Sequence, residues 1–379
     1  MTTVVHIITA LERGGAQRVV LECAAELSNS DATHHVITGD ENALGAEARQ
    51  RLGCRLHVEN SLRNPISRHD LRALFALSAR LSRIRDNASW PFFVHTHGSK
   101  AGVLGRLAGR SIPSAKIVHT VHGFGLDALG GRYRAILLAA EKLAGAATDA
   151  MVFVNEADAE QAKRWRLAPR ASHHIVRAGI PAQKYRAFGP NHPARQTLRD
   201  EFGIANGAPL VVSVANLKPQ KDPLFHLQAF AAFRRYQPEA QYLFLGDGPL
   251  RSQMQTQAKK LGLADALHLP GFWSEPGPAL AAADVFMLAS AWEGLPCSVL
   301  EAHCAGLPIA LRAGSWADAL QFPSAIYRTS EHASPNAVAE KLNAAWTAGR
   351  GAPRTLPPSF TQTGMLADYR RLYETLGAS

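Results

Sequence analysis

Ser290-Ala-Trp-Glu-Gly-Leu-Pro-Cys-Ser-Val-Leu-Glu301 is the stretch that decides the fold. It follows the apolar run 284–288 (DVFML), which is typical of a buried strand, and it leads into a short helix that Gly306 closes. Pro296 suits the first helical position, because an N–H group there would have no partner within the helix. The helix N-terminus then directs N–H groups and the positive end of its dipole to the carboxyl edge of a sheet, where a phosphate can bind.

The same stretch carries a longer pattern, E-G-L-P-x-x-x-x-E-A-x-x-x-G-x-P, which begins at Glu293. This pattern resembles the signature of the family 4 retaining glycosyltransferases, which have the GT-B fold. The resemblance implies that Glu301 accepts both ribose hydroxyls of a nucleotide sugar, since an ionised carboxylate has two acceptor oxygens. It also implies that Glu293, with the N–H groups of Gly294 and Leu295, holds the transferred sugar. The alternative is that both glutamates are solvated surface charges, as most glutamates are.

The length of 379 residues predicts two domains, and the composition is that of a globular protein. Apolar residues make up 46% and charged residues 19%. The sequence has neither an apolar run of about eighteen residues nor a leader-like N-terminus, so we expect a cytoplasmic protein. The four cysteines lie at positions 23, 54, 297 and 304, without the spacing of a metal site, which suits free thiols in a reducing compartment. We therefore expect no metal.

Positive charge is concentrated in the first half of the chain. Residues 1–190 contain 25 Lys and Arg against 16 Asp and Glu, whereas residues 191–379 contain 16 against 15. Such a surface can attract an anionic membrane, which predicts peripheral contact with its inner face, or a phosphorylated acceptor. Nucleic acid is the weakest partner class, because the sequence contains no recognition module.

Two amphipathic helices are predicted in this basic half. Residues 68–85 combine arginines with an apolar stripe, and residues 132–146 repeat apolar residues at helical spacing. The first stripe consists of Leu71, Leu74, Leu77, Leu81 and Ile84, and the second of Tyr133, Ile136, Leu137, Ala140 and Leu143. For the first helix we expect the stripe to pack on a sheet, with docking on a membrane as the alternative.

The first domain offers three candidate ligand-binding segments. Gly14 and Gly15 lie between the strand VVHIITA and a helix, where backbone can approach an anion closely. The strands FFVHTH and KIVHTVH end in His97 and His122, at the edge where open α/β sheets bind ligands. The resemblance implies that Gly15 faces the donor diphosphate and His122 the donor sugar. It places Gly14, His97 and Lys100 at the acceptor; the alternative for the two histidines is a structural role.

The second domain repeats the pattern of strand, loop and helix. After the strand LVVSVANL, Lys221 matches the family lysine that binds the diphosphate, whereas Asn216 stands where the family has an arginine. This departure leaves the site short of one positive charge, and whether Lys218 substitutes for the arginine stays open. Gly246 ends another strand where backbone can approach the nucleotide, and Phe272 matches the segment whose main chain reads the base.

The expected fold class is α/β, a GT-B arrangement of two Rossmann-like domains facing across a cleft. We expect an acceptor-binding domain at 1–185, a nucleotide-sugar-binding domain at 186–355 and a C-terminal helix at 356–379 that crosses back to the first domain. The resemblance covers roughly residues 4–310 and implies a retaining hexosyltransferase, with Glu293 and His122 as the candidate catalytic residues. Its donor would be a UDP-sugar, its acceptor a cell-envelope or exopolysaccharide glycan carried on a lipid, and no metal cofactor would be needed.

Two alternatives stay open at this point. A nucleotide-sugar epimerase of the same fold would consume UDP-sugar without an acceptor. A non-catalytic partner subunit would bind nucleotide or glycan without turnover, and Asn216 in place of the arginine is the feature that favours it. Fold similarity does not decide between these functions.

Overall fold

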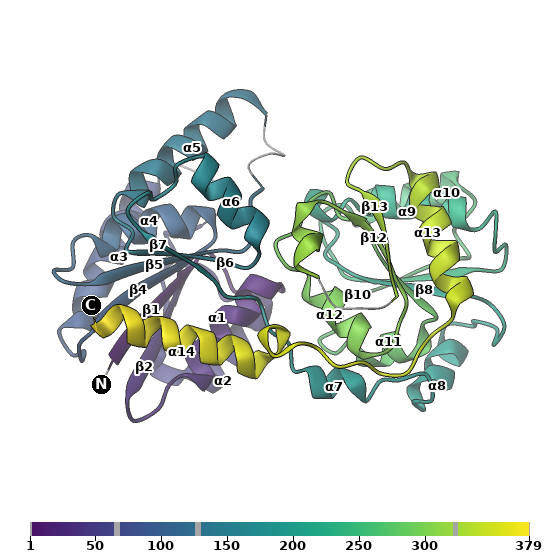
Figure 1. Ribbon diagram of the computed structural model, residues 1–379, viewed down its shortest axis with the longest axis horizontal. Helices are drawn as coiled ribbons and strands as arrows, with labels where there is room; N and C mark the ends of the chain where they lie inside the picture. The colour runs from purple at the N-terminus through teal and green to yellow at the C-terminus, as the bar shows by residue number, and fades with distance from the viewer. Residues whose placement is uncertain (1, 64–68, 126–129, 321–324, 379) are drawn as a thin grey trace. The chain divides into compact units, whose positions relative to one another are not determined.

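The computed structural model describes residues 2–63, 69–125, 130–320 and 325–378. The chain divides into two compact units (Figure 1), of which unit 1 comprises the residues up to Gly179 together with the C-terminal helix from Gln362, and unit 2 comprises Ile180–Thr361. The division falls six residues before the predicted boundary at 186. It follows the hydrogen bonds: Gly179 N–H donates to the sulfur of Met365 in the C-terminal helix, whereas Ile180 N–H donates to the Phe360 carbonyl.

Unit 1 is built on a seven-stranded parallel sheet in the order β3-β2-β1-β4-β5-β6-β7. The order reverses between β1 and β4, which is the point where open α/β sheets bind ligands. The strands are β1 Thr2–Ile8, β2 Ala32–Thr38, β3 Leu56–Val58, β4 Phe92–His97, β5 Lys116–Val121, β6 Ala150–Phe153 and β7 Ser172–Ile175.

Helices cover both faces of this sheet. Leu77 and Leu81 pack with Val94 on one face, and Tyr369 and Tyr373 of the last helix, yellow in Figure 1, pack against His95 on the other. The helices of unit 1 are α1 Gly15–Glu26, α2 Gly45–Leu52, α3 Asp70–Arg85, α4 Ser99–Gly109, α5 Gly131–Gly145, α6 Glu156–Arg164 and α14 Gln362–Ala378, with 3₁₀ turns at Asn42–Leu44 and Gly53–Arg55.

Unit 2 is built on a six-stranded parallel sheet in the order β10-β9-β8-β11-β12-β13, which reverses between β8 and β11. Its strands are β8 Leu210–Val214, β9 Gln241–Leu245, β10 Leu267–Gly271, β11 Val285–Leu288, β12 Ile309–Ala313 and β13 Ile326–Ser330. Its α-helices are α7 Ala182–Arg186, α8 Ala194–Glu201, α9 Pro223–Phe233, α10 Arg251–Lys260, α11 Gly277–Ala282, α12 Cys297–Cys304 and α13 Pro335–Ala348. The 3₁₀ turns are η4 Pro219–Lys221, η5 Ser315–Ala319 and η6 Pro358–Phe360. The predicted fold class, two Rossmann-like α/β units, is confirmed.

Three details differ from the sequence-based expectation. Helix α12 begins at Cys297 with Pro296 as its N-cap, one residue later than predicted. Helix α3 buries Ala73, Leu77 and Leu81, but Leu71 is 69% exposed because it lies on the opposite side of the first turn from Ala73. Arg68, the start of the predicted helix, lies outside the described residues. On α5, Ile136 is 59% exposed, so part of the second apolar stripe faces away from the core of unit 1.

No helix among the described ranges has the length and apolar character required to cross a membrane.

Candidate functional site

The charged centre of unit 2 lies at the switch point between β8 and β11. Lys221 ends the turn η4 that follows β8, and Glu293 lies in the loop that follows β11. The Lys221 Nζ atom is 2.5 Å from Glu293 Oε1 and 2.7 Å from Oε2, and Ser290 Oγ donates to Oε1 at 2.6 Å. Glu293 is only 7% exposed. It is therefore an anchored, ion-paired carboxylate, and the alternative of a solvated loop charge is wrong for it.

Hydrogen bonds between the two loops hold this pair in place. Ala291 N–H donates to the Gln220 carbonyl at 2.9 Å, and Gln220 Nε2 donates to the Trp292 carbonyl at 3.3 Å. Buried His226 of α9 accepts from Ala289 N–H at 2.8 Å through Nε2, so its Nδ1–H donates to the Asp222 carbonyl at 3.1 Å. Burial lowers the pKa of His226 to about 4, which keeps the ring neutral in this bridge.

Glu301 lies in the second turn of α12 and is partly buried. Its carboxylate accepts a hydrogen bond from the hydroxyl of Tyr185 on α7, a side chain that is 7% exposed. Burial, with the negative charge of Glu301 next to it, raises the pKa of Tyr185, so the hydroxyl stays a donor. Tyr185 orients the carboxylate that the sequence predicts as the ribose ligand.

The remaining predicted donor residues lie at the same edge of the sheet. Asn216 follows β8, and its carbonyl accepts from Lys218 N–H at 2.9 Å. Gly246 follows β9 and donates its N–H to the Gly271 carbonyl at 2.9 Å. A Cβ on Gly246 would lie 1.9 Å from the Ala215 carbonyl oxygen, so the packing of the loop after β8 requires glycine there.

Three other predicted donor residues complete this edge. Phe272 directly follows β10 and is partly buried, while Gly294 and Leu295 are buried between Glu293 and the start of α12. The structure therefore gathers the predicted donor residues of unit 2 at the carboxyl ends of β8, β9, β10 and β11. Their contacts with a nucleotide stay predictions.

Unit 1 has a cavity of about 660 Å³ at its own switch point. Its wall is mostly apolar, and the predicted acceptor residues His97 and Lys100 line it. Lys100 Nζ lies 2.7 Å from Asp70 Oδ1, so an ion pair forms one polar side of the cavity. The lining residues come from the ends of β1 and β4, the segments after them, and α1, α3, α4 and α5: Ile8, Thr9, Ala10, Glu12, Ala16, Gln17, Asp70, His97, Gly98, Ser99, Lys100, Val103, Leu104, Ile136, Leu137 and Ala140.

The glycines and His122 adjoin this cavity. Gly14 caps α1 and Gly15 begins it, next to the lining residues Ala16 and Gln17. His122 directly follows β5, and its Nε2 atom lies 3.1 Å from Nδ1 of His97. Burial lowers the pKa of His122 to about 4, so its imidazole is neutral near pH 7.

Sequence reasoning missed several residues of these sites. Ser290 bonds Glu293, His226 joins the two loops that carry the ion pair, and Tyr185 bonds Glu301. Each is of a common residue type, and two come from other helices. The position of His226, soon after K-P-Q-K-D-P, offered only a weak signal. In unit 1 the residues on α5 that line the cavity were predicted only as an apolar helical stripe.

Two family models match the chain in sequence. The model described as Glycosyltransferase Family 4 matches residues 13–184, and that described as Glycosyl transferases group 1 matches residues 194–318. The two matches together span both ligand-binding edges.

Among curated relatives, an Escherichia coli UDP-Gal:alpha-D-GlcNAc-diphosphoundecaprenol alpha-1,3-galactosyltransferase is 28% identical over 243 residues, which are 63% of this chain and 61% of the relative. The match thus spans about three fifths of the length of that protein.

Solved structures agree in fold. Anabaena Alr3699/HepE in complex with UDP-glucose matches with a TM-score of 0.77 at 17% identity over 100% of both chains. A glycosyltransferase from Rickettsia africae matches with a TM-score of 0.72 at 16% identity, over 99% of this chain and 98% of that one.

Proposed function

Since the chain belongs to the family 4 glycosyltransferases, with the GT-B fold, we propose that it transfers a hexosyl group from a nucleotide sugar to a glycan acceptor. We propose UDP as the nucleotide and a lipid-carried cell-envelope or exopolysaccharide glycan as the acceptor. The ion pair between Lys221 and Glu293 at the switch point of unit 2 is the observation that carries the proposal.

The proposed chemistry depends on charge at the leaving group. As the bond between sugar and phosphate breaks, negative charge grows on the diphosphate, and a fixed ammonium group stabilises it. Lys221 supplies that group, and the N-terminus of α12 adds the positive end of its dipole. Because Asn216 replaces the family arginine, Lys221 carries more of this task than in relatives with both cations.

Glu293 is proposed to hold the sugar and not to attack it. Both of its carboxylate oxygens lie within hydrogen-bond distance of Lys221, and one also accepts from Ser290. A carboxylate neutralised in this way is a weak nucleophile. We therefore propose retention by attack on the face that the diphosphate leaves, with that diphosphate accepting the acceptor's proton and His122 against the donor sugar.

The acceptor class is proposed from the cavity in unit 1. An apolar wall with a polar side formed by His97 and the pair of Lys100 with Asp70 suits a molecule that joins a hydrocarbon chain to a phosphate or sugar. The name of the Escherichia coli relative describes such an acceptor, a sugar on diphosphoundecaprenol. The proposed acceptor of this chain is of the same chemical class.

Peripheral membrane contact is proposed for the same unit. Phe75 on α3 is 72% exposed, and Tyr133 and Leu143 on α5 are 66% and 64% exposed. Arginines flank them on a unit that carries most of the net positive charge of the chain. The full chain should co-sediment with vesicles that contain phosphatidylglycerol, and Phe75→Ser with Leu143→Ser should weaken this binding. Equal sedimentation of the variant would contradict the proposed contact.

Calorimetric titration with UDP-Glc, UDP-Gal, UDP-GlcNAc and GDP-Man, followed by release of nucleotide in the presence of membrane extract, tests the function. One donor should bind, and its nucleotide should be released only when the extract is present. Binding without release would indicate a non-catalytic subunit, and conversion of the donor without extract would indicate an epimerase. Retained turnover in EDTA is expected from the proposed metal independence.

A further inference from the structure

Four histidines form a diagonal row on one face of the sheet of unit 1. The row crosses four neighbouring strands: His34 on β2, His6 on β1, His97 on β4 and His122 just after β5. In the strand register, His34 pairs with Val4, Ile8 pairs with His97, and His97 pairs with Thr120. Each step along the row therefore moves one strand across and two residues toward the carboxyl edge. Because side chains alternate between faces with a period of two, all four imidazoles lie on the same face.

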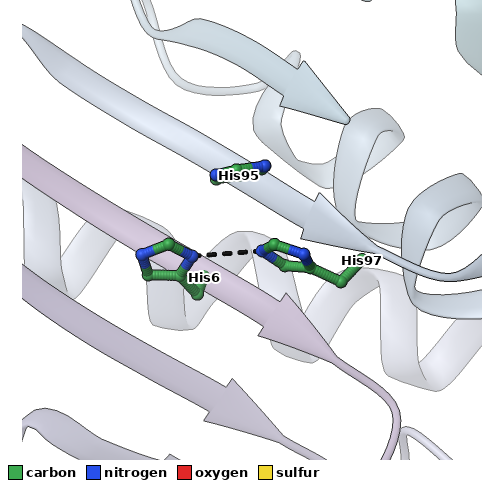
Figure 2. Close-up of side chains that lie close together, drawn as sticks. All are labelled: His6, His95 and His97. Atoms are coloured by element: carbon green, nitrogen blue, oxygen red, sulfur yellow. Dashed lines mark hydrogen bonds between the residues drawn. The ribbon is translucent and has the colours of Figure 1, made fainter. Parts of the chain in front are cut away.

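The contacts along this row repeat one geometry. Nδ1 of His34 is 3.1 Å from Nε2 of His6, Nδ1 of His6 is 3.1 Å from Nε2 of His97, and Nδ1 of His97 is 3.1 Å from Nε2 of His122. Figure 2 shows the middle contact, which joins rings on adjacent strands. His34, His6 and His97 are at most 1% exposed, and His122 is partly buried at the edge of the sheet.

This geometry couples the tautomers of the four rings. A neutral imidazole has one N–H donor and one acceptor nitrogen, and the two middle rings use both nitrogens within the row. If His6 donates through Nδ1, its Nε2 must accept, and the same condition then holds at His97. Only two arrangements satisfy all three contacts: every ring protonated on Nδ1, or every ring protonated on Nε2. Burial lowers the pKa of His6 to about 3 and that of His97 well below 6.5, so the rings stay neutral.

A metal site is the competing explanation, because ring nitrogens of His6, His95 and His97 lie within 4.8 Å of one another. The nitrogens of His95, however, lie 2.6 Å from the Tyr373 hydroxyl and 2.7 Å from the Thr120 hydroxyl. Both nitrogens of His6 and of His97 are occupied within the row. A metal ion would have to break these hydrogen bonds to obtain its ligands, so the contacts favour the hydrogen-bonded row.

We propose that His34, His6 and His97 are positioning residues that lock the ring plane of His122 and let its tautomer change only if all four rings change together. The Nδ1 atom of His122, which has no hydrogen-bond partner among the described residues, then keeps one hydrogen-bonding role at the carboxyl edge of β5 unless the whole row switches. Only the contact between His122 and a donor sugar rests on the proposed function. The lock among the four histidines depends on unit 1 alone. Protein groups fix histidine tautomers in the same way in other sites, by bonding the nitrogen that does not face the ligand.

Nitrogen-15 NMR of the histidine-labelled full chain near pH 7.5 tests the lock directly. The four rings should be neutral and should share one tautomer. Opposite tautomers on two neighbours in the row would overturn the proposal without any variant. A stoichiometric metal content after purification without added metal would overturn it too, in favour of a metal site.

A pair of variants separates the lock from simple packing. His6→Phe should leave His97 and His122 in a mixture of tautomers, because the link to His34 is broken. His35→Phe is the matched control: His35 is the next residue on β2, its ring faces the other side of the sheet, and its Nδ1 makes the same 3.1 Å contact, with Nε2 of His57. The control should leave the His122 signals unchanged. Unchanged His122 signals in folded His6→Phe would contradict the lock.

Turnover gives a second readout. If the two tautomers of His122 become equally populated in His6→Phe, kcat should fall about twofold at unchanged KM for the donor, since only one tautomer is productive. If the wild type transfers no sugar, the proposed function is wrong. The NMR measurement alone then tests whether the four histidines share one tautomer.

Discussion

Lys221 and Glu293 illustrate how far single residues could be predicted. A motif match was enough to predict both as donor-binding residues, because an ammonium group suits a diphosphate and a carboxylate suits the hydroxyls of a sugar. Their mutual contact was not predictable, since it depends on how the loops after β8 and β11 meet through Gln220 and His226. Tyr185 escaped prediction for the same reason, because nothing in its local sequence indicates a carboxylate partner more than one hundred residues away.

Removing Lys221 tests the pair. In Lys221→Met the Glu293 carboxylate stays buried without its cation, so the free energy of unfolding of unit 2 should fall by roughly 2–4 kcal/mol, and UDP-sugar affinity should fall as well. Chemical denaturation and calorimetry measure the two effects. Adding Glu293→Gln should recover part of the stability but not the affinity. Lys259→Met on α10 serves as the control. An equal loss of stability and affinity in this variant would contradict the role of the ion pair between Lys221 and Glu293.

Glu301→Ala should weaken UDP binding by about 10–100-fold, because a charged hydrogen-bonding group to the ribose is worth about 1.5–3 kcal/mol. Tyr185→Phe should weaken it less, since it removes only the hydroxyl that orients the carboxylate. Titration of UDP into each variant measures the difference. Wild-type affinity in Glu301→Ala, with Glu340→Ala as the matched surface change, would show that Glu301 is not the ribose ligand.

At the scale of elements, the sequence patterns identified the central strands of both sheets and several helices, because apolar runs and helical spacing are local signals, but they missed outer strands such as β2 and β13. Helix α3 shows the limit: periodicity predicted that Leu71 would be buried, but the face that packs on the sheet runs through Ala73 and Leu77, and Leu71 lies outside it. Helix α14 shows another limit, because its Tyr369 and Tyr373 are matched to His95 and Thr120 more than two hundred residues earlier.

The histidine-bearing strands predict acid sensitivity. Burial holds the pKa of His6 near 3 and the pKa values of His34, His95 and His97 well below 6.5, so below pH 6.5 the unfolded chain binds protons that the folded chain does not. Stability is therefore lost as the pH falls from 6.5 toward these values, by up to about 1.4 kcal/mol per pH unit for each ring. Thermal unfolding between pH 8 and 5 should show a flat Tm above pH 7 and a steep fall below 6. A Tm independent of pH would contradict the buried neutral state.

Docking of α14 can be tested at one hydroxyl. Tyr373→Phe leaves Nδ1 of buried His95 without the 2.6 Å partner it has, which should cost roughly 1–3 kcal/mol of the unfolding free energy of unit 1. Denaturant titration measures the loss. Tyr133→Phe, on the exposed surface of α5, should cost little, and similar losses for both tyrosines would contradict the role of the His95 contact.

At the scale of the whole molecule, two Rossmann-like units were predictable because each repeats the alternation of strand and helix and places its glycines and charges at strand ends. The exact boundary was not, since Gly179 and Ile180 differ only in which partners they bond. The expected cleft between the domains stays a prediction.

Unit 2 is one continuous segment, so the fragment Ile180–Thr361 should fold alone. It should bind UDP within about tenfold of the full chain, because Lys221 and Glu301 lie in it and it lacks only the contact predicted for Gly15, one hydrogen bond worth about 0.5–1.5 kcal/mol. Calorimetry on the fragment, with its Lys221→Met variant as control, checks this. A folded fragment that fails to bind UDP would move the nucleotide contacts to unit 1.

Unit 1 is discontinuous, and this has a consequence for how the protein is made. The ribosome releases α14 only after unit 2, so the sheet face that α14 covers stays exposed while all of unit 2 is synthesised. An apolar face left bare for that time would invite aggregation. A face bearing His34, His6, His95 and His97 can be hydrated instead, and the same imidazoles later find partners in one another and in the closing tyrosines. The polar character of this buried face thus suits a nascent chain that completes its first domain only after its second.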